Sequence, residues 1–510
     1  MGLLRNALLI AASVGGLCGS ADAAWHEASS KHFVIYSDEK PDRLQEFATR
    51  LEKFDQAVRF ARSMQDHAPG QGNRLTVFVV SNIGQVQKFS QMKDRDVAGF
   101  YSGRATGSIA FVPRRAGDGS KTALDPETIF FHEYAHHLMM QELSQPYPEW
   151  MIEGFAEFMS TAIFEKDGSV GLGAPALHRA YSLFSDVQIP IAQLLAGNYG
   201  KLDSERRASL YARGWLLAHY MTFEPKRRGQ LEAYLKGIAK GDEPLTAAEA
   251  AFGDLSQLER DADAYLKRRK MSYLSIPAAK AQPGRIDIRP LSEGASAIIT
   301  LRMQSKSGVD QKTSGPLAQQ IRVVGAKYPD DPFVQVSLAE AEHDAENLAA
   351  AWSAAERALK ADPRSTEAMT YKGRVMMAKA EKSGSEAEWK EARRWLLAAN
   401  KLDTEDPEPL MLFYQSYVRQ GERPTANAIA ALHYAARLAP QDGGLRMTSA
   451  MAYLNERKLD EARLEIAPIA YDPHGGEFAA TARRMLELVA KGEVDSALGM
   501  RKVEAEASGE

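Results

Sequence analysis

A spacing of small residues and prolines repeats in the second half of this 510-residue chain. Two sets of residues show the same successive intervals of 12, 7 and 5: Ala339, Ala351, Ala358 and Pro363, and then Ser416, Ala428, Ala435 and Pro440. Small side chains at such intervals let two antiparallel helices pack closely, and proline ends the second helix because it lacks a backbone N–H. The spacing therefore predicts stacked helix pairs.

These intervals resemble the tetratricopeptide repeat, and two further sets fit it less regularly: Gly373, Ala392 and Ala399, and then Ala450, Ala462 and Pro473. A helix over residues 477–489 is expected to cover the last apolar face, since a solenoid end must be capped. We predict an all-α tetratricopeptide solenoid over residues 317–491 and a polar C-terminal tail over 492–510. A generic helical bundle is the alternative.

The preceding part of the chain has a different pattern. Residues 276–316 are rich in proline and glycine and predict a linker, in which residues 298–303 could form a short strand. Residues 24–275 form the first predicted domain. Strands are expected near 32–37, 75–81 and within 101–112, and helices over 43–64 and through most of 148–273. This is an α+β pattern.

A helix is also predicted to begin at Asp125 and Pro126, which are good residues for the N-cap and the first helical position. On this helix His132 and His136 lie one turn apart on the same face. The residues around the two histidines are mostly apolar. Burial of both imidazoles would therefore cost on the order of several kcal/mol unless a partner such as a metal satisfies them. A satisfied pair of core histidines is the plainer alternative.

A catalytic zinc ion has three protein ligands and an open position for water, whose pKa it lowers. Glu153 follows His136 by 17 residues, enough for a turn and an antiparallel helix, and is the best candidate for the third ligand. Glu133 is the candidate base for that water. Glu157, one turn after Glu153, could hold the second ring nitrogen of His132. His137 faces about 100° away and is expected to support the site or lie at the surface.

At these residues the sequence resembles the gluzincin zinc metallopeptidases, which include thermolysin and the zinc aminopeptidases, and more closely their bacterial peptidase-MA-like relatives. The resemblance covers roughly residues 30–235. It implies a thermolysin-like catalytic domain that binds one Zn²⁺ ion. The first glutamate of an E-G-x-A segment is the third zinc ligand in that group, and it corresponds to Glu153.

Family aminopeptidases also carry a Tyr-x-Lys-Gly segment, whose tyrosine stabilises the oxyanion of the reaction. The segment YARG at residues 211–214 is similar, with Arg for Lys, and implies this role for Tyr211. A core stripe at helical spacing is the alternative reading, and His219 and Tyr220 are weaker candidates.

Gluzincins present an edge strand to the substrate backbone, and residues 97–101 or 107–112 would suit that position. Aminopeptidases place there a glutamate that binds the substrate's free amine. Neither stretch contains an acidic residue, which favours an endopeptidase or a processing enzyme.

The first 23 residues read as a secretory signal peptide, with Arg5, an apolar run over 7–17 and a small-x-small ending at Ala23. We therefore expect an exported protein, periplasmic in a double-membrane bacterium and otherwise secreted, with no transmembrane segment in the mature chain. The only cysteine, Cys18, lies within the signal, which excludes disulfides and thiolate ligands from the mature chain. A net charge of −4 does not indicate the basic character that is typical of nucleic-acid-binding proteins.

Together these features predict an exported zinc metallopeptidase that hydrolyses peptide bonds in a protein or peptide substrate. The repeats would recruit that substrate or a partner protein. The alternative is a catalytically lapsed peptidase fold that serves as a repeat-based scaffold. The intact base and the complete set of candidate ligands favour the enzyme.

Overall fold

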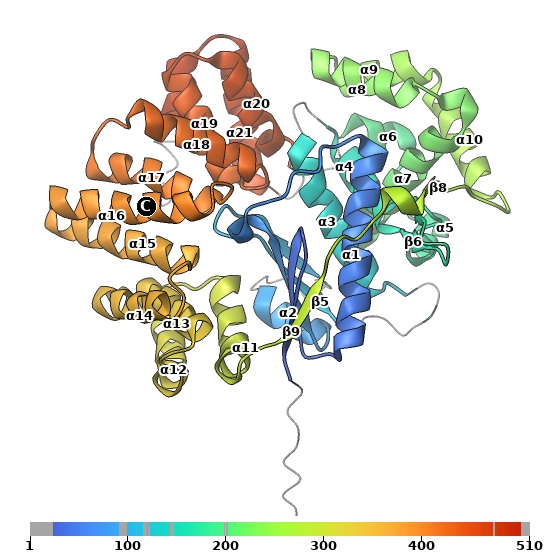
Figure 1. Cartoon of the computed structure of the whole chain (residues 1–510). Helices are drawn as coiled ribbons and strands as arrows, with labels where there is room; N and C mark the ends of the chain where they lie inside the picture. Colours follow the sequence, from blue (N-terminus) through green and yellow to red (C-terminus); the bar gives the residue numbers. More distant parts are fainter. Residues whose placement is uncertain are drawn as a thin grey trace, which may run out of the picture.

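The computed structural model describes residues 24–90, 99–115, 120, 123–142, 147–197, 199, 202–472 and 475–500. The predicted signal peptide, Pro473 and residues 501–510 lie outside the described residues. The molecule is mainly helical, with one larger mixed sheet and one small sheet (Figure 1). Within the described ranges, every helix is too short or too polar to serve as a membrane span.

Within the described residues, six strands form the larger sheet. Their spatial order is β4 (Phe100–Ser102), β5 (Ile109–Pro113), β3 (Leu75–Val80), β2 (Phe33–Ser37), β1 (His26–Ser29) and β9 (Asp287–Pro290). The pairs β5/β3 and β3/β2 are parallel, and the other pairs are antiparallel. The predicted strands near 32–37, 75–81 and within 101–112 are all present. β9 adds a strand from the segment that was predicted to be a linker.

Helices cover both faces of this sheet. α1 (Pro41–Arg62) and α3 (Pro126–Glu142) pack on one face, where the rings of Phe54 and Phe131 stack with centroids 4.1 Å apart. α2 (Ile83–Ser90) and α11 (Glu293–Ser307) cover the other. The strand expected at 298–303 is wrong, because this stretch is part of α11. Ile299 and Met303 lie one helical turn apart there and are buried against the sheet.

The rest of the first domain is mostly helical, as predicted for residues 148–273. Its helices are α4 (Glu149–Ser160), α5 (Ala180–Phe184), α6 (Ile191–Ala196), α7 (Ser204–Phe223), α8 (Gln230–Lys240), α9 (Pro244–Phe252) and α10 (Leu255–Leu266). A small antiparallel sheet of β6 (Ile163–Phe164), β7 (Val170–Leu172) and β8 (Leu274–Ile276) was not predicted.

Successive antiparallel helices build the second half of the chain. They are α12 (Ser314–Lys327), α13 (Pro332–Asp344), α14 (Leu348–Ala361), α15 (Thr366–Ser383), α16 (Glu386–Leu402), α17 (Pro407–Gln420), α18 (Ala426–Leu438), α19 (Gly443–Asn455), α20 (Leu459–Ala470) and α21 (Gly476–Ala490). The small residues of the two regular repeat sets are fully buried between these helices: Ala339, Ala351, Ala358, Ser416, Ala428 and Ala435. α21 coincides with the expected terminal helix.

The segment predicted as a polar tail differs from that expectation. Residues 494–500 are helical, and Val494 and Ala497 are buried in the apolar core of the last helices. Both side chains extend the apolar face of the solenoid end, so this part of the chain belongs to the cap.

The solenoid curves along one side of the first domain (Figure 1). The ring of Phe333 packs on Tyr36 of the sheet, and the backbone N–H of Gln71 donates to Asp403 over 2.7 Å. Further along, Asn73 donates to the carbonyl of Leu438 over 2.7 Å. These contacts join the two halves into one body.

Candidate metal centre

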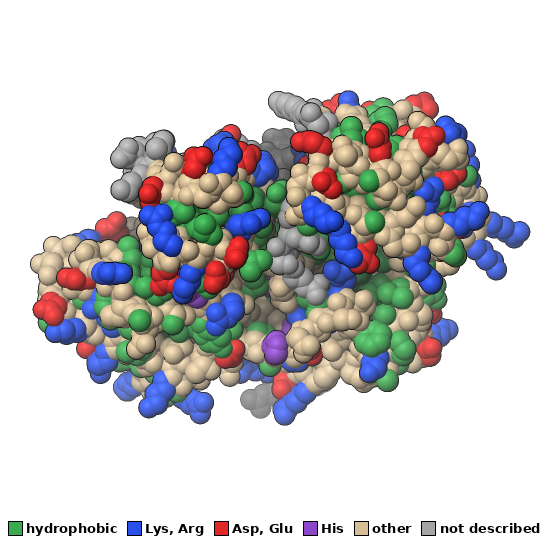
Figure 2. Space-filling view, turned by 90° about the horizontal axis from the view of Figure 1, so that it is seen from above, with side chains coloured by type: hydrophobic (Ala, Val, Ile, Leu, Met, Phe, Trp, Pro, Cys, Tyr) green, Lys and Arg blue, Asp and Glu red, His purple; other side chains and the backbone are tan. Residues whose placement is uncertain are grey.

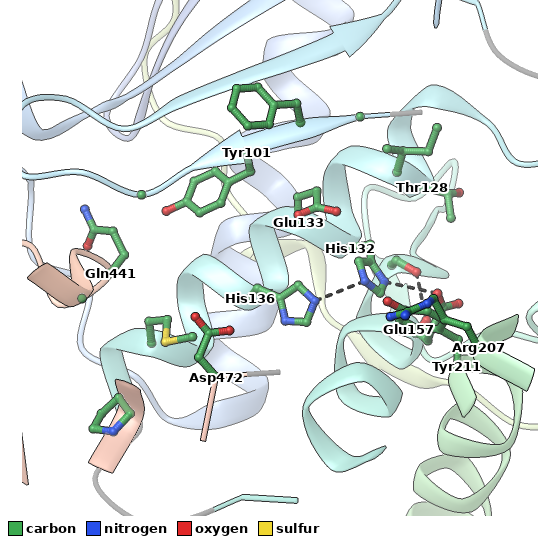
Figure 3. Close-up of a pocket in the computed structure, with 18 of the residues that line it drawn as sticks. Tyr101, Thr128, His132, Glu133, His136, Glu157, Arg207, Tyr211, Gln441 and Asp472 are labelled. Carbon is green, nitrogen blue, oxygen red and sulfur yellow. Dashed lines mark hydrogen bonds and ion pairs between the residues drawn. The ribbon is translucent and has the colours of Figure 1, made fainter. Parts of the chain in front are cut away.

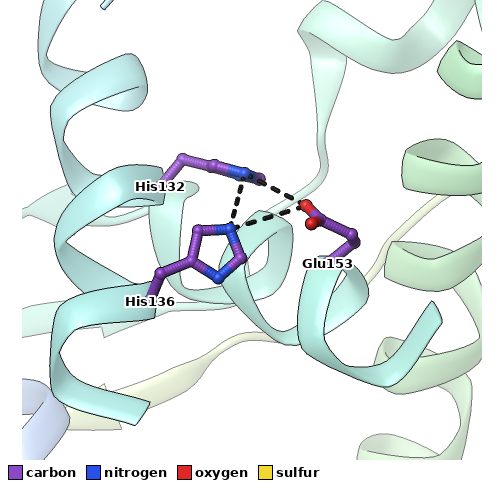
Figure 4. Close-up of side chains that lie close together, drawn as sticks. All are labelled: His132, His136 and Glu153. Carbon is purple, nitrogen blue, oxygen red and sulfur yellow. Dashed lines mark hydrogen bonds and ion pairs between the residues drawn. The ribbon is translucent and has the colours of Figure 1, made fainter. Parts of the chain in front are cut away.

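Three side chains converge in the first domain (Figure 4). The Nε2 atoms of His132 and His136 are 3.2 Å apart, and Oε2 of Glu153 lies 3.3 Å from the former and 3.5 Å from the latter. Tetrahedral zinc with bonds of 2.0–2.1 Å requires ligand atoms about 3.3–3.4 Å apart. The two imidazoles and the carboxylate therefore fit one zinc ion in both donor type and spacing.

Local sequence explains the position of the histidines. Asp125 caps α3 as predicted, because its Oδ1 accepts from the backbone N–H groups of Glu127 and Thr128. The helix then carries His132 and His136 on one face. Their partner Glu153 comes from α4, which packs against α3 and buries this carboxylate almost completely.

Two glycines bring a third helix to the site. A Cβ added to Gly154 would lie 2.5 Å from the carbonyl carbon of Gly214, so only glycine at both positions lets α4 and α7 approach this closely. The contact places Tyr211 of α7 beside the candidate metal ligands, with its ring centroid 5.8 Å from that of His132. The glycines in the EG and YARG segments thus have a packing role.

Glu157 lies behind His132, as predicted. Its Oε1 is 3.2 Å from Nδ1 of His132, and its Oε2 is 2.9 Å from Nε2 of His178. Arg179 also forms an ion pair with this carboxylate. Burial would raise the pKa of Glu157, but Arg179 and the two histidines hold it well below its usual range. The residue is ionised and can fix the orientation of the His132 ring.

The carboxylates also determine the charge balance at His132. Burial lowers the pKa of this imidazole, but hydrogen bonds and charges from Glu153 and Glu157 outweigh burial and raise the pKa to about 10. Two buried carboxylates around one imidazole favour a positive charge at this point, which a divalent cation would also satisfy.

Glu133 and Tyr211 both line the cleft that His132 and His136 also line (Figure 3). Figure 3 shows Glu133 on the side of α3 that faces Tyr101, between this strand residue and the histidines. Burial and the charge of Glu153 raise the pKa of Tyr211 although Arg179 opposes them. Its phenol remains protonated at neutral pH and can donate a hydrogen bond.

An edge strand borders the cleft, as the family resemblance implies. It is β4, which overlaps the candidate stretch 97–101, whereas residues 107–112 run into β5 inside the sheet. The hydroxyl of Tyr101 lies 2.7 Å from Nδ1 of His137, so this histidine supports the site by joining the edge strand to α3. Burial lowers the pKa of His137 to about 4. Its neutral ring can therefore accept a hydrogen bond from the hydroxyl of Tyr101.

A second group of possible ligands, His32, Glu52 and Asp55, lies on the far side of α3. Its donors and acceptors are already matched. His32 bonds to Glu52 at 2.7 Å, and Asp55 accepts from Arg59 and from the hydroxyl of Tyr134. Because Tyr134 belongs to α3, this buried network anchors the helix to α1.

The other candidates from the sequence lie away from the cleft. Arg213 of the YARG segment forms ion pairs with Glu259 and Asp263. His219 bonds to the carbonyl of Ser272 and to Tyr265 in the core, and Tyr220 is also buried in the core.

Sequence reasoning missed several residues of the cleft. His178 and Arg179 follow Glu157 by about twenty positions on a short turn, and no spacing rule links them to it. Arg207 precedes Tyr211 by one helical turn, a spacing that could have indicated it. Residues of the repeats complete the lining, among them Gln441 and Asp472 (Figure 3).

Neither protein-family models nor curated proteins give a match to this chain.

Proposed function

We propose that this protein is a zinc-dependent metallopeptidase, with His132, His136 and Glu153 as the ligands of one Zn²⁺ ion. The supporting observation is the spacing of their three donor atoms, 3.2–3.5 Å, next to a cleft that the two histidines line together with the carboxylate of Glu133 and the phenol of Tyr211. Export, which rests on residues 1–23, and recruitment of a partner protein by the repeats belong to the same proposal.

The chain's own groups are arranged for amide hydrolysis. When bound, zinc would supply Lewis acidity, which polarises a carbonyl and lowers the pKa of water. Glu133 takes the proton from the attacking water and passes it to the leaving amine. Tyr211 donates its O–H to the oxyanion that develops on the substrate, which contributes roughly 3–4 kcal/mol when one such donor acts.

The edge strand supports a peptide as the substrate. β4 lies at the edge of the sheet, and within the described residues no other strand pairs with its outer side. An extended peptide can therefore bind alongside it by backbone hydrogen bonds. The described cleft residues of this strand region, Gly99 to Tyr101 and Gly103, include no carboxylate for a free amine, which favours cleavage within a chain.

Zinc content and proteolysis test this proposal. Purified wild type, Glu153→Gln and Glu149→Gln are compared by elemental analysis, since Glu149 begins the same helix outside the three-ligand group. We expect about one zinc per chain in wild type and the Glu149 variant, and little zinc in Glu153→Gln, which lacks one of the three proposed ligands.

The second measurement is cleavage of unfolded casein by the zinc-loaded proteins. Glu133→Gln should retain zinc and lose about 10²–10⁴-fold in activity, as expected for removal of a general base. Wild-type protein that stays metal-free in excess zinc, or zinc-loaded protein without Glu133-dependent cleavage, would refute the proposal.

A further inference from the structure

Both halves of the chain contribute residues to the cleft at the proposed metal ligands. Its volume is about 1030 Å³, and its wall opposite the zinc helix comes from the last repeats. Figure 2 shows a hollow between the two halves of the molecule, with hydrophobic side chains on the flank formed by the solenoid. The repeat residues that the following argument uses are Gln441, Asp442, Gly443, Ile469, Asp472 and Phe478.

This wall is held against the first domain by hydrogen bonds. Asp442, at the start of α19, accepts from the backbone N–H of Ala105 over 2.8 Å. The neighbouring Gln441 donates to the hydroxyl of Ser108 over 3.1 Å. Because Ala105 and Ser108 belong to the connection between β4 and β5, the wall and the edge strand keep a fixed separation.

An apolar surface lies on this wall. Phe478 is 39% exposed although it is a large aromatic residue, and it lines the cleft together with the buried Ile469. Gly443 leaves room beside it, since an added Cβ would lie 3.3 Å from the ring of Phe478 and 3.9 Å from Ile469. Phe478 and Ile469 therefore both lie beside Gly443 on this wall.

We infer that the last repeats supply a specificity subsite: Phe478, with Ile469 nearby, binds a large apolar side chain of an extended peptide that lies between β4 and the solenoid. The inference rests on the proposed peptidase function. A cleft of this volume accepts a short chain segment but no folded domain, so the substrate is an unfolded segment or a flexible terminus. Burial of an apolar side chain against Phe478 favours that residue near the cleaved bond.

This wall gives the repeats a direct role in the proposed enzyme, because they form one side of its cleft. The segment that follows α20 places Asp472 on the wall that faces His136 (Figure 3). A catalytic domain without the solenoid would lose this side of its cleft. Selection of the substrate then depends on residues more than 300 positions after the zinc helix.

The test uses the full-length, zinc-loaded protein. Cleavage sites in unfolded casein are mapped by mass spectrometry, and one cleaved peptide is then synthesised with Phe, Leu, Ala, Ser or Lys at each position near the scissile bond. We expect wild type to prefer Phe or Leu over Ser at one position by about 10–200-fold in kcat/KM.

Phe478→Ala should abolish this preference mainly through KM, with zinc content and Tm close to wild type. Phe60→Ala is the matched control, because Phe60 is a comparably exposed aromatic residue on α1 outside the cleft. Phe478→Glu should change the preferred residue at the same position from apolar to Lys, a gain that partial unfolding cannot produce.

The outcomes separate the two proposals. Wild-type cleavage with the same apolar preference in Phe478→Ala and no Lys preference in Phe478→Glu would overturn the subsite and leave the peptidase function standing. Zinc-loaded wild type that cleaves no peptide would overturn both.

Discussion

The carboxylate of Asp442 holds two parts of the chain together, because its Oδ2 accepts from the backbone N–H of Ala105 while its Oδ1 accepts from that of Leu445 at the start of α19. Both distances are 2.8 Å. One side chain therefore caps a repeat helix and fixes the solenoid to the β4–β5 connection, next to the candidate active site.

Replacement of this residue should cost more than the loss of a helix cap. We expect Asp442→Ala to lower the free energy of unfolding by roughly 2–4 kcal/mol, since the buried amide of Ala105 also loses its acceptor. Asp254 caps α10 through Ser256 and Gln257 and serves as the control, with an expected loss of about 1 kcal/mol for Asp254→Ala. Equal losses in urea unfolding would show that the interdomain bond contributes nothing.

Glu157 should affect the zinc affinity of the protein through its contact with His132. We expect Glu157→Gln to weaken zinc binding by about 10–100-fold, because the neutral amide no longer fixes the ring of His132, whose Nε2 is a proposed zinc ligand. His178→Gln removes another partner of Glu157 and should weaken zinc binding much less. Zinc affinities measured by competition with a chelator distinguish the two, and equal effects would argue against a role through His132.

Tyr211 should act on the rate of reaction. We expect Tyr211→Phe to lower kcat by about 10²–10³-fold with little change in zinc content, because it removes only the hydroxyl to which the proposed mechanism assigns the oxyanion. Tyr181 is 82% exposed on α5, and Tyr181→Phe controls for the loss of a phenol group. A variant at Tyr211 with normal kcat would assign this ring to packing.

Asp406 should make the junction between the two halves sensitive to pH. Burial, the charge of Glu408 and that of Asp403 raise the pKa of Asp406 from 3.8 to about 8, although the N–H of Glu408 opposes the shift. The unfolded state releases this proton first as pH rises. Stability is therefore greatest below the unfolded value and declines by at most about 1.4 kcal/mol per pH unit up to the folded pKa.

Asp406→Asn should remove this dependence and keep the oxygen that accepts from Glu408. The difference in unfolding free energy between variant and wild type should shift in favour of the variant between pH 5 and pH 7.5. Urea unfolding across this range measures the difference, and parallel pH profiles would contradict the raised pKa.

Local sequence determined much of the fold and of the candidate metal centre. His132 and His136 share a helix face because their spacing matches one turn, and Glu153 required only a reversal of the chain. Ala339 and its equivalents indicated close helix pairs through their size and intervals. The stretch 298–303 was mistaken for a strand, since a short apolar run between proline- and glycine-rich flanks has no clear period.

Only the tertiary structure decided what surrounds the three candidate ligands. His178, Arg179 and the repeat residue Phe478 reach the cleft from turns and helices whose relative positions depend on long-range packing. The approach of α7 to α4 at Gly154 and Gly214, and the curvature of the solenoid, set those positions. An interval in the sequence indicates which residues lie close together within one helix or turn. The walls of this cleft, in contrast, come from segments that are hundreds of positions apart in the sequence.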